Sequence, residues 1–238
     1  MRAVRLGIAA AVAAAALLVF PATAPRPPQH ARRATGKIAT APWPYLPGSI
    51  VPVRVDGFPV PYHVALVGPG SLLADGRYVI PVDAPPGSAT LVAGNAAGLA
   101  ERSVHIGSVP SFEHDMLAVA SYDDGILFHD ARTFAVLGLL ATGGTPSDVA
   151  GDGAGHIAAT DTQGPAITLI GAAPWNVTHV QDVPFGDEVA FDRRTGAIFV
   201  TNRDVRGAGA LTRVDAGGHI SQVATGLTAE GLAIDERR

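Results

Sequence analysis

Apolar and polar residues alternate along most of this chain in short runs, and Gly, Asp and Pro separate the runs. In its second half one phrase is written three times, at residues 146–152, 186–192 and 229–235. Val149, Val189 and Leu232 hold the same place in the three copies, at spacings of 40 and 43 residues. A period near ~40 residues, built from short strands and tight turns, is the spacing of four-stranded propeller blades.

Further alternating runs follow each phrase and complete the predicted blades. The second strands are expected at 116–121, 156–161 and 197–202. The third strands are expected at 125–130, 166–170 and 210–215. The fourth strands are expected at 134–141, 177–183 and 220–225. Residues 109–238 therefore predict one blade without a clear first strand, two full blades, and a lone first strand at 229–235.

These strands carry a family resemblance. Ile198–Asn202 (IFVTN) resembles the signature of YVTN propellers, and Asp187–Asp192 (DEVAFD) resembles a strand of their YncE-like and lactonase-like members. Leu117–Ser121, followed by Gly125–Asp130, resembles another strand pair of the same family. The resemblance implies a β-propeller. It does not choose an activity, since members of this fold include binders, surface proteins and enzymes.

The number of repeats departs from that family, because propellers close with about 4 to 8 blades. We expect a truncated or frame-split reading frame. The alternatives are completion of the propeller by a partner chain, or an arc capped by the N-terminal module. An unclosed arc leaves strand edges and a blade face open, which predicts self-association through the open propeller edges.

Residues 44–108 alternate in the manner of half-buried strands. Runs are expected at 50–55, 62–67, 77–81, 89–93 and 101–106. Their spacing predicts a small β-sandwich, and the stretch resembles the immunoglobulin-like modules of bacterial cell-surface proteins. The predicted fold class is therefore all-β: a small Ig-like β-sandwich followed by a partial β-propeller of about three blades.

The N-terminus predicts the compartment. Arg2 and Arg5 precede an unbroken apolar run over 6–20, and Ala22-Thr23-Ala24 ends it. This is the pattern of a secretory signal peptide over 1–24, with an uncleaved membrane anchor as the alternative. A Pro/Arg-rich linker is expected over 25–43. We expect an exported protein, periplasmic or extracellular, that meets a membrane through this segment alone.

The composition of the chain excludes several classes of partner and of chemical site. The formal charge is −4 and no Lys/Arg stripe is present, which argues against nucleic-acid binding. The chain has no cysteine, which excludes disulfides, thiolate metal sites and a cysteine nucleophile. No histidine pair has zinc-site spacing, and no nucleophile elbow or phosphate loop is present. The expected partner is a protein or small-molecule ligand that the sequence does not specify.

The candidate chemistry lies at the start of the innermost strands, which face the mouth of a propeller channel. Asp148, Glu188 and Glu230 occupy these places and could hold a divalent cation through carboxylate oxygens. Propeller lactonases of the gluconolactonase type, which these repeats resemble, use such a metal to polarise an ester carbonyl. The competing interpretation is that these acids cap turns. We expect a non-catalytic recognition or scaffold protein without a cofactor, with a metal-dependent lactonase as the alternative.

Overall fold

The structure is a computed structural model that describes residues 36–58, 60–96, 98–111, 115–163, 167–180, 183, 185–202, 209–226, 229 and 231–235. Within these residues the chain is all-β, with strands β1 to β19 and no helix. No helix with the length and hydropathy of a membrane span occurs in this described part. The predicted signal peptide at 1–24, and the linker as far as residue 35, lie outside the described residues.

The N-terminal module contains eight short strands in three small antiparallel sheets, ordered β1–β3, β2–β6–β5 and β4–β7–β8. Their bounds are β1 Lys37–Ala39, β2 Ile50–Pro52, β3 Arg54–Asp56, β4 His63–Val67, β5 Ser71–Leu72, β6 Arg77–Val79, β7 Gly87–Asn95 and β8 Gly98–Ile106. The three sheets enclose one hydrophobic core, in which Val51, Tyr78 and Leu91 are fully buried.

Two predictions for this module were wrong. The linker expected over 25–43 ends in strand β1, whose Ile38 is 2% exposed in the core. Its three residues form too short an alternation to stand out beside the Pro/Arg-rich sequence. The single strand expected over 50–55 is divided into β2 and β3, which belong to different sheets. Pro52 has no N–H to continue the β2 ladder, and the chain changes pairing partner directly after it.

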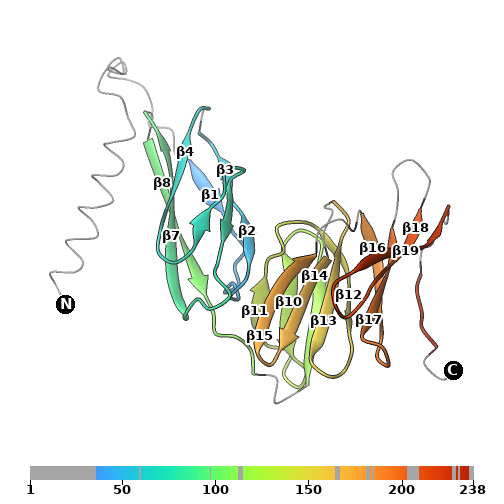
Figure 1. The fold of residues 1–238 in the computed structure, drawn as a ribbon. Helices are drawn as coiled ribbons and strands as arrows, with labels where there is room; N and C mark the ends of the chain where they lie inside the picture. Colours follow the sequence, from blue (N-terminus) through green and yellow to red (C-terminus); the bar gives the residue numbers. More distant parts are fainter. Residues whose placement is uncertain are drawn as a thin grey trace.

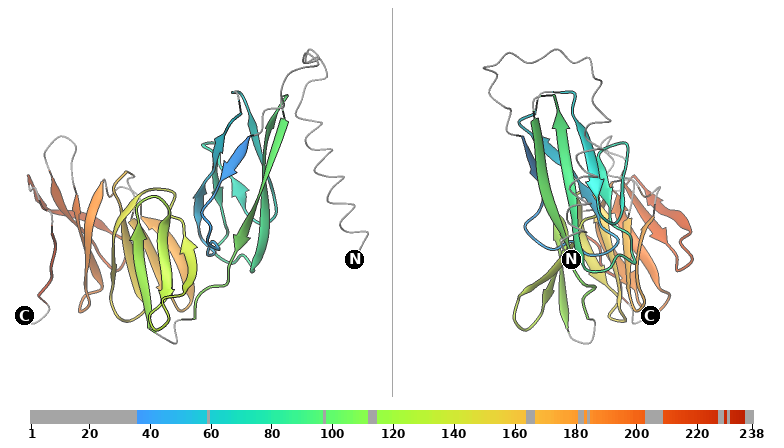
Figure 2. Two further views of the ribbon diagram at one scale, coloured as in Figure 1. Left: turned by 180° about the vertical axis from the view of Figure 1, so that it is seen from behind. Right: turned by 90° about the vertical axis from the view of Figure 1, so that its left-hand side faces the viewer.

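The second half of the chain forms three sheets that follow one another along an arc (Figures 1 and 2). Blade 1 contains β9 Met116–Ser121, β10 Gly125–Asp130 and β11 Val136–Leu140. Blade 2 contains β12 Pro146–Gly151, β13 His156–Asp161, β14 Ile167–Ala172 and β15 Trp175–Val180. Blade 3 contains β16 Gly186–Asp192, β17 Ala197–Asn202, β18 Ala210–Val214 and β19 Ile220–Thr225. Each blade is an antiparallel meander in sequence order, which confirms the predicted strand succession.

Apolar side chains fill the spaces between the blades. Ile126, Phe128 and Leu140 of blade 1 pack with Ala159 and Ile170 of blade 2. On the other side of blade 2, the same kind of core is formed with blade 3 by Ala158, Ile167, Val189, Ile198, Val200 and Val214. Blade 2 therefore buries apolar side chains on both of its faces, one against each neighbouring blade.

The N-terminal module is joined to blade 1 by residues 44–46, here called the bridging segment. Tyr45 forms parallel bridges to Ile106 of β8 and to Leu139 of β11. The N–H of Leu46 donates to the carbonyl of Leu139, and the N–H of Leu139 donates to the carbonyl of Pro44, both at 2.8 Å. The bridging segment thus fills the outermost position of blade 1 and makes one continuous sheet from the module to the blade. The sequence did not predict this connection.

The third copy of the phrase does not form the lone strand predicted at 229–235. In the described residues 229 and 231–235 the chain has no strand, and Leu232 is half-buried. A strand is stabilised by a neighbour that supplies hydrogen-bond partners, and no second strand of a further blade occurs in the described part of the chain.

Candidate functional site

The acids at the start of the innermost strands come from equivalent places in two blades. Asp148 lies near the start of β12, and Asp187 and Glu188 lie near the start of β16. Because the two strands are neighbours at the inner edge of the arc, the fold brings Asp148 close to Glu188, as the repeat predicted. Glu230, the third predicted ligand, lies outside the described residues.

Asp148 connects two blades through the backbone. One of its carboxylate oxygens accepts a hydrogen bond from the N–H of Val149, and the other accepts one from the N–H of Val189, both at 2.8 Å. The hydroxyls of Ser147 and Thr160 donate to the carbonyl of Asp187, at 2.7 and 2.9 Å. These polar side chains of blade 2 therefore hold the innermost strand of blade 3 in place.

Glu188 is the counterpart of Asp148 in blade 3. Its N–H donates to the hydroxyl of Thr201 at 3.0 Å, as the N–H of Asp148 does to Thr160 at 3.2 Å. Burial raises the pKa of the Glu188 carboxyl, and the nearby charges of Asp148 and Asp187 raise it further. A raised pKa means that the folded chain disfavours the charged form of this side chain.

The described part of the chain contains no group of three or more His, Cys, Asp or Glu side chains placed to hold a metal ion. The structure brings together two of the three predicted ligands. Both carboxylate oxygens of Asp148 accept backbone hydrogen bonds, as expected for the interpretation that these acids satisfy backbone N–H groups.

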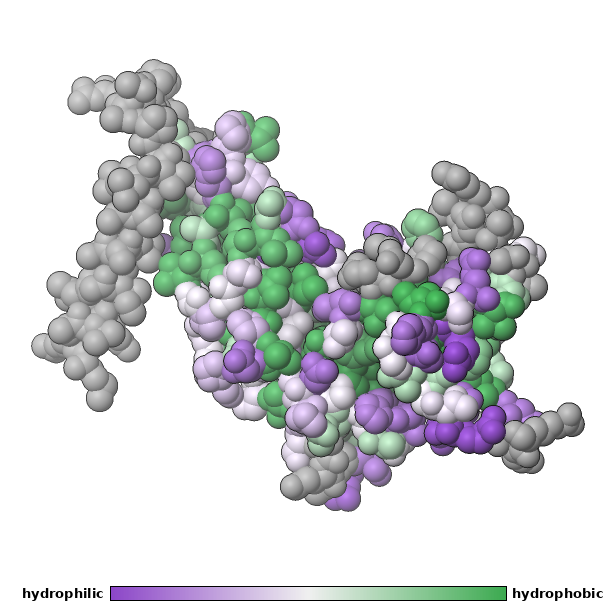
Figure 3. Space-filling view, in the orientation of Figure 1, coloured by the Kyte–Doolittle hydropathy of each residue, from purple (hydrophilic) through white to green (hydrophobic). Residues whose placement is uncertain are grey.

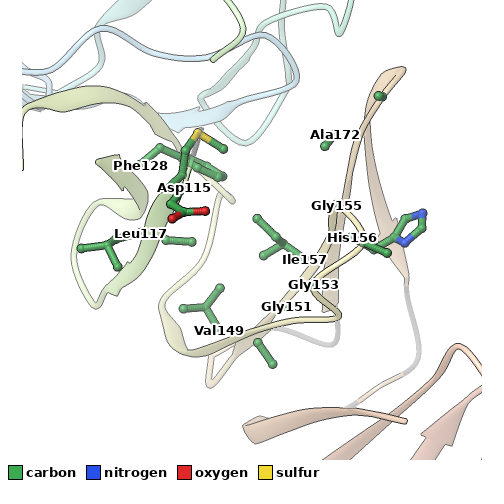
Figure 4. A pocket seen from close by; sticks show the side chains of 15 residues that line it. Asp115, Leu117, Phe128, Val149, Gly151, Gly153, Gly155, His156, Ile157 and Ala172 are labelled. Carbon is green, nitrogen blue, oxygen red and sulfur yellow. The ribbon is translucent and has the colours of Figure 1, made fainter. Parts of the chain in front are cut away.

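A groove of about 630 Å³ lies between blades 1 and 2. Its apolar lining comes from Met116 and Phe128 of blade 1 and from Val149 and Ile157 of blade 2. Figure 4 shows Val149 and Ile157 pointing across the groove towards the strands that carry Leu117 and Phe128, whereas the His156 ring lies on the outer side. Glycines of the β12–β13 turn form one wall, so the backbone is accessible there.

The rim of this groove carries a histidine–carboxylate pair that the sequence analysis did not single out. The ring nitrogen Nδ1 of His156 lies 2.5 Å from a carboxylate oxygen of Asp152. The other oxygen of Asp152 accepts hydrogen bonds from the N–H groups of Ala154 and His156. Burial alone would raise the pKa of Asp152, but the hydrogen bonds from His156 and Ala154 lower it.

A second pair of the same kind shows what this arrangement does. Asp215 accepts hydrogen bonds from the N–H groups of Gly217 and His219, and the His219 ring lies 3.4 Å from it. An aspartate four residues before a histidine is the sequence signal common to both. Both pairs close a tight turn between strands and fix its geometry.

The exposed surface differs between the two ends of the molecule. Figure 3 shows broad apolar areas on the N-terminal module, whereas polar side chains are more frequent over the last blade. On the module, Val60 and Leu99 are among the exposed large hydrophobic residues, at 82% and 54%.

No protein-family model matches the chain, and no curated protein sequence matches it. Among solved structures, it is similar to one from a nidogen–laminin complex, with 13% identity, coverage of 59% of each chain and a TM-score of 0.42. It is similar to virginiamycin B lyase from Staphylococcus aureus, with 12% identity, coverage of 68% of this chain and 59% of that chain, and a TM-score of 0.32. It is also similar to a protein of unknown function from Bacteroides thetaiotaomicron, with 13% identity, coverage of 84% and 50%, and a TM-score of 0.31.

The chain spans 50 to 59% of the length of these three structures. All three TM-scores lie below 0.5, so the description of the blades rests on the strand order and repeat of this chain itself.

Proposed function

We propose that this chain is an exported, non-catalytic recognition or scaffold protein of the cell envelope. In this proposal an Ig-like module precedes a partial propeller of the YVTN type. The observation that carries the proposal is the use of Asp148: both of its carboxylate oxygens accept backbone N–H groups. The acid best placed for chemistry at the inner edge is thereby engaged in holding two blades together.

The groove between blades 1 and 2 is the surface best suited to recognition. Its floor is made of Met116, Phe128, Val149 and Ile157, and a glycine-rich turn borders it. An apolar floor with accessible backbone suits an apolar or aromatic group of a small ligand or of a peptide. The histidine–aspartate pair at the rim could add polar contacts without taking part in a reaction.

Export is the first test of this proposal. Residues 1–35, which precede the first described strand, are fused to alkaline phosphatase, a reporter that is active only outside the cytoplasm. We expect phosphatase activity, because the apolar run at 6–20 follows Arg2 and Arg5. Leu17→Arg combined with Leu18→Arg should abolish the activity, whereas the apolar substitution Ala14→Leu should retain it. An inactive parent fusion that is stably expressed would contradict the localisation.

A second candidate function is a metal-dependent hydrolase of the lactonase type. It is favoured by the closeness of Asp148, Asp187 and Glu188, which is reflected in the raised pKa of Glu188. A bound divalent cation would favour the charged carboxylates and could polarise an ester carbonyl. The two functions differ in what they require of Glu188, so one substitution separates them.

Glu188→Gln should stabilise the chain at neutral pH. The folded-state pKa of Glu188 is raised, so the folded chain loses stability as the pH rises from about 4.3, the ordinary glutamate value, to the raised value. Gln cannot ionise, so the variant should unfold at higher temperature than the parent at pH 7 and at the same temperature near pH 3. Glu101→Gln, an exposed substitution in the module, is the control and should change neither value.

The same measurement with added Mg²⁺ or Ca²⁺ tests the hydrolase. If the cation raises the unfolding temperature of the parent but not that of Glu188→Gln, and an ester substrate is turned over, the non-catalytic proposal is wrong. If a chelator and the cations leave both proteins unchanged, the hydrolase is excluded.

A further inference from the structure

Within the described residues, blade 1 lacks the innermost strand that blades 2 and 3 possess. Its sheet order is β11–β10–β9, whereas the other two blades begin with β12 and β16. β9 is equivalent to β13 and β17, the second strands. It contacts β12, the inner strand of the next blade, as β13 contacts β16. In the described part of the chain, β9 pairs with β10 on one side and with no strand on the other.

The burial of equivalent side chains shows that this position is open. Ile198 and Val200 of β17 face the neighbouring blade and are 5% and 0% exposed. Their counterparts in β9 are Leu117 and Val119, which are 41% and 45% exposed. Val149 of β12 is half-buried, whereas its counterpart Val189 is 6% exposed. Leu117 and Val119 are exposed because no blade precedes blade 1 in the described part of the chain, whereas Ile198 and Val200 are covered by blade 2. Val149 packs towards blade 1, so its partial exposure is expected when the inner strand of blade 1 is missing.

The N-terminal module does not close this gap. It covers the outer half of blade 1, where Leu127, Leu139 and Ala141 pack into the module core. No residue of β9 belongs to that core. The module therefore caps only the outer strands of blade 1, and no described residue of the module pairs with the edge of β9.

One segment of the same chain has the sequence of the missing strand. Residues 229–235 are the third copy of the inner-strand phrase, and the described part of this copy forms no strand. We propose that Gly231–Asp235 of one chain pairs with β9 of a second copy of this chain and becomes the innermost strand of its blade 1. The binding mode is strand addition to an open sheet edge, in which backbone hydrogen bonds give affinity and alternate side chains give register.

The repeat fixes the register of this pairing. Val149 pairs with Ala159 in blade 2, and Val189 pairs with Val200 in blade 3. The equivalent pair is Leu232 with Val119, which places Ile234 opposite Leu117. Both apolar side chains of the incoming segment then lie beside the two exposed side chains of β9, on the same face of the sheet. The opposite register would point them to the other face.

The polar contacts between blades also favour this occupant. The carboxylate of Asp148 in blade 2 accepts a hydrogen bond from the N–H of Val189, and this bond joins two adjacent inner strands. Glu188 holds the same place in blade 3 and could accept the N–H of Leu232 in its own chain. The segment would then lie beside its own blade 3 while it pairs with the second copy.

Disulfide trapping tests the proposal, because the full chain has no cysteine of its own. A Val119→Cys chain is mixed with a Leu232→Cys chain of different tagged length under mild oxidation. Directly opposite residues of paired strands lie within disulfide distance, so a covalent heterodimer should form in high yield. The matched control replaces Leu232→Cys by Ala233→Cys, whose side chain would point to the opposite face and should give little product.

The outcomes decide the proposal. No heterodimer, or equal yields with Leu232→Cys and Ala233→Cys, would overturn it. The double variant Val119→Cys/Leu232→Cys shows which copy is used: dimers or longer covalent ladders support a second copy, whereas a cross-linked monomer overturns it. Light scattering gives an independent readout. Leu232→Asp should convert the associated parent to monomers, and its unfolding temperature should no longer depend on protein concentration, whereas Val223→Asp, an exposed site on β19, should leave the association unchanged.

Discussion

Replacing Leu46 with alanine should lower the free energy of unfolding by about 2–5 kcal/mol, the range for a large buried side chain. Leu46 belongs to the bridging segment and is fully buried between blades 1 and 2. Its surroundings are fitted closely to it: a Cβ added at Gly138 would lie 2.5 Å from its Cδ2. Few rearrangements could fill the cavity left by alanine, so the loss should fall in the upper part of this range.

The same substitution tests whether the module and the arc unfold together. Leu46 enters the core between the blades, while the adjacent Tyr45 enters the core of the module. We therefore expect one cooperative transition for the parent in urea, seen alike by far-UV circular dichroism and by tryptophan fluorescence. Leu99→Ala, at a position 54% exposed, is the control and should cost less than about 0.5 kcal/mol. Two separate transitions in the parent would show that the bridging segment does not couple the two parts.

The blade strands could be predicted because each carries its own local signal. The expected runs at 116–121, 156–161 and 197–202 coincide with β9, β13 and β17. An alternating run bounded by Gly or Asp is sufficient for such a strand, since the pattern and the turn residues lie within the run itself. The third phrase carries the same local signal and forms no strand, because pairing depends on a partner that its own residues do not supply.

The bridging segment could not be predicted for the opposite reason. Pro44-Tyr45-Leu46 shows no alternation, and its hydrogen-bond partners lie far away in the sequence, at His105 and Leu139. The position of Trp175 depends on the same segment, since its ring nitrogen donates to the carbonyl of Pro47 at 3.0 Å. Such contacts are decided by the packing of the whole molecule.

The position of the candidate site could be predicted from the sequence, but the role of its carboxylates could not. The repeat alone placed Asp148 and Glu188 at equivalent places of adjacent inner strands, and the structure brings them together. The use of the Asp148 carboxylate depends on the N–H of Val189, which comes 41 residues later in the chain. A carboxylate that could bind a cation and one that caps two backbone N–H groups have the same sequence signature.

Asp148→Ala should lower the free energy of unfolding by about 2–4 kcal/mol, because hydrogen bonds to a charged group contribute about 1.5–3 kcal/mol each. The variant loses the acceptor for the N–H of Val189, a residue that is 6% exposed. Part of the loss should be offset, since removal of the Asp148 charge relieves the Glu188 carboxyl. The free energy of unfolding of Asp148→Asn should lie between those of the parent and Asp148→Ala, because the single carbonyl oxygen of Asn can accept one of the two hydrogen bonds.

Urea denaturation of the three proteins, in chelator and in a divalent cation, separates the structural use of Asp148 from a metal-binding use. If Asp148 connects the blades through the backbone, the difference between the parent and Asp148→Ala is the same in both solutions. If the carboxylate mainly holds a cation, the difference nearly vanishes in chelator. That second result would make the backbone contacts at 2.8 Å secondary to a metal site and would move the balance towards the hydrolase.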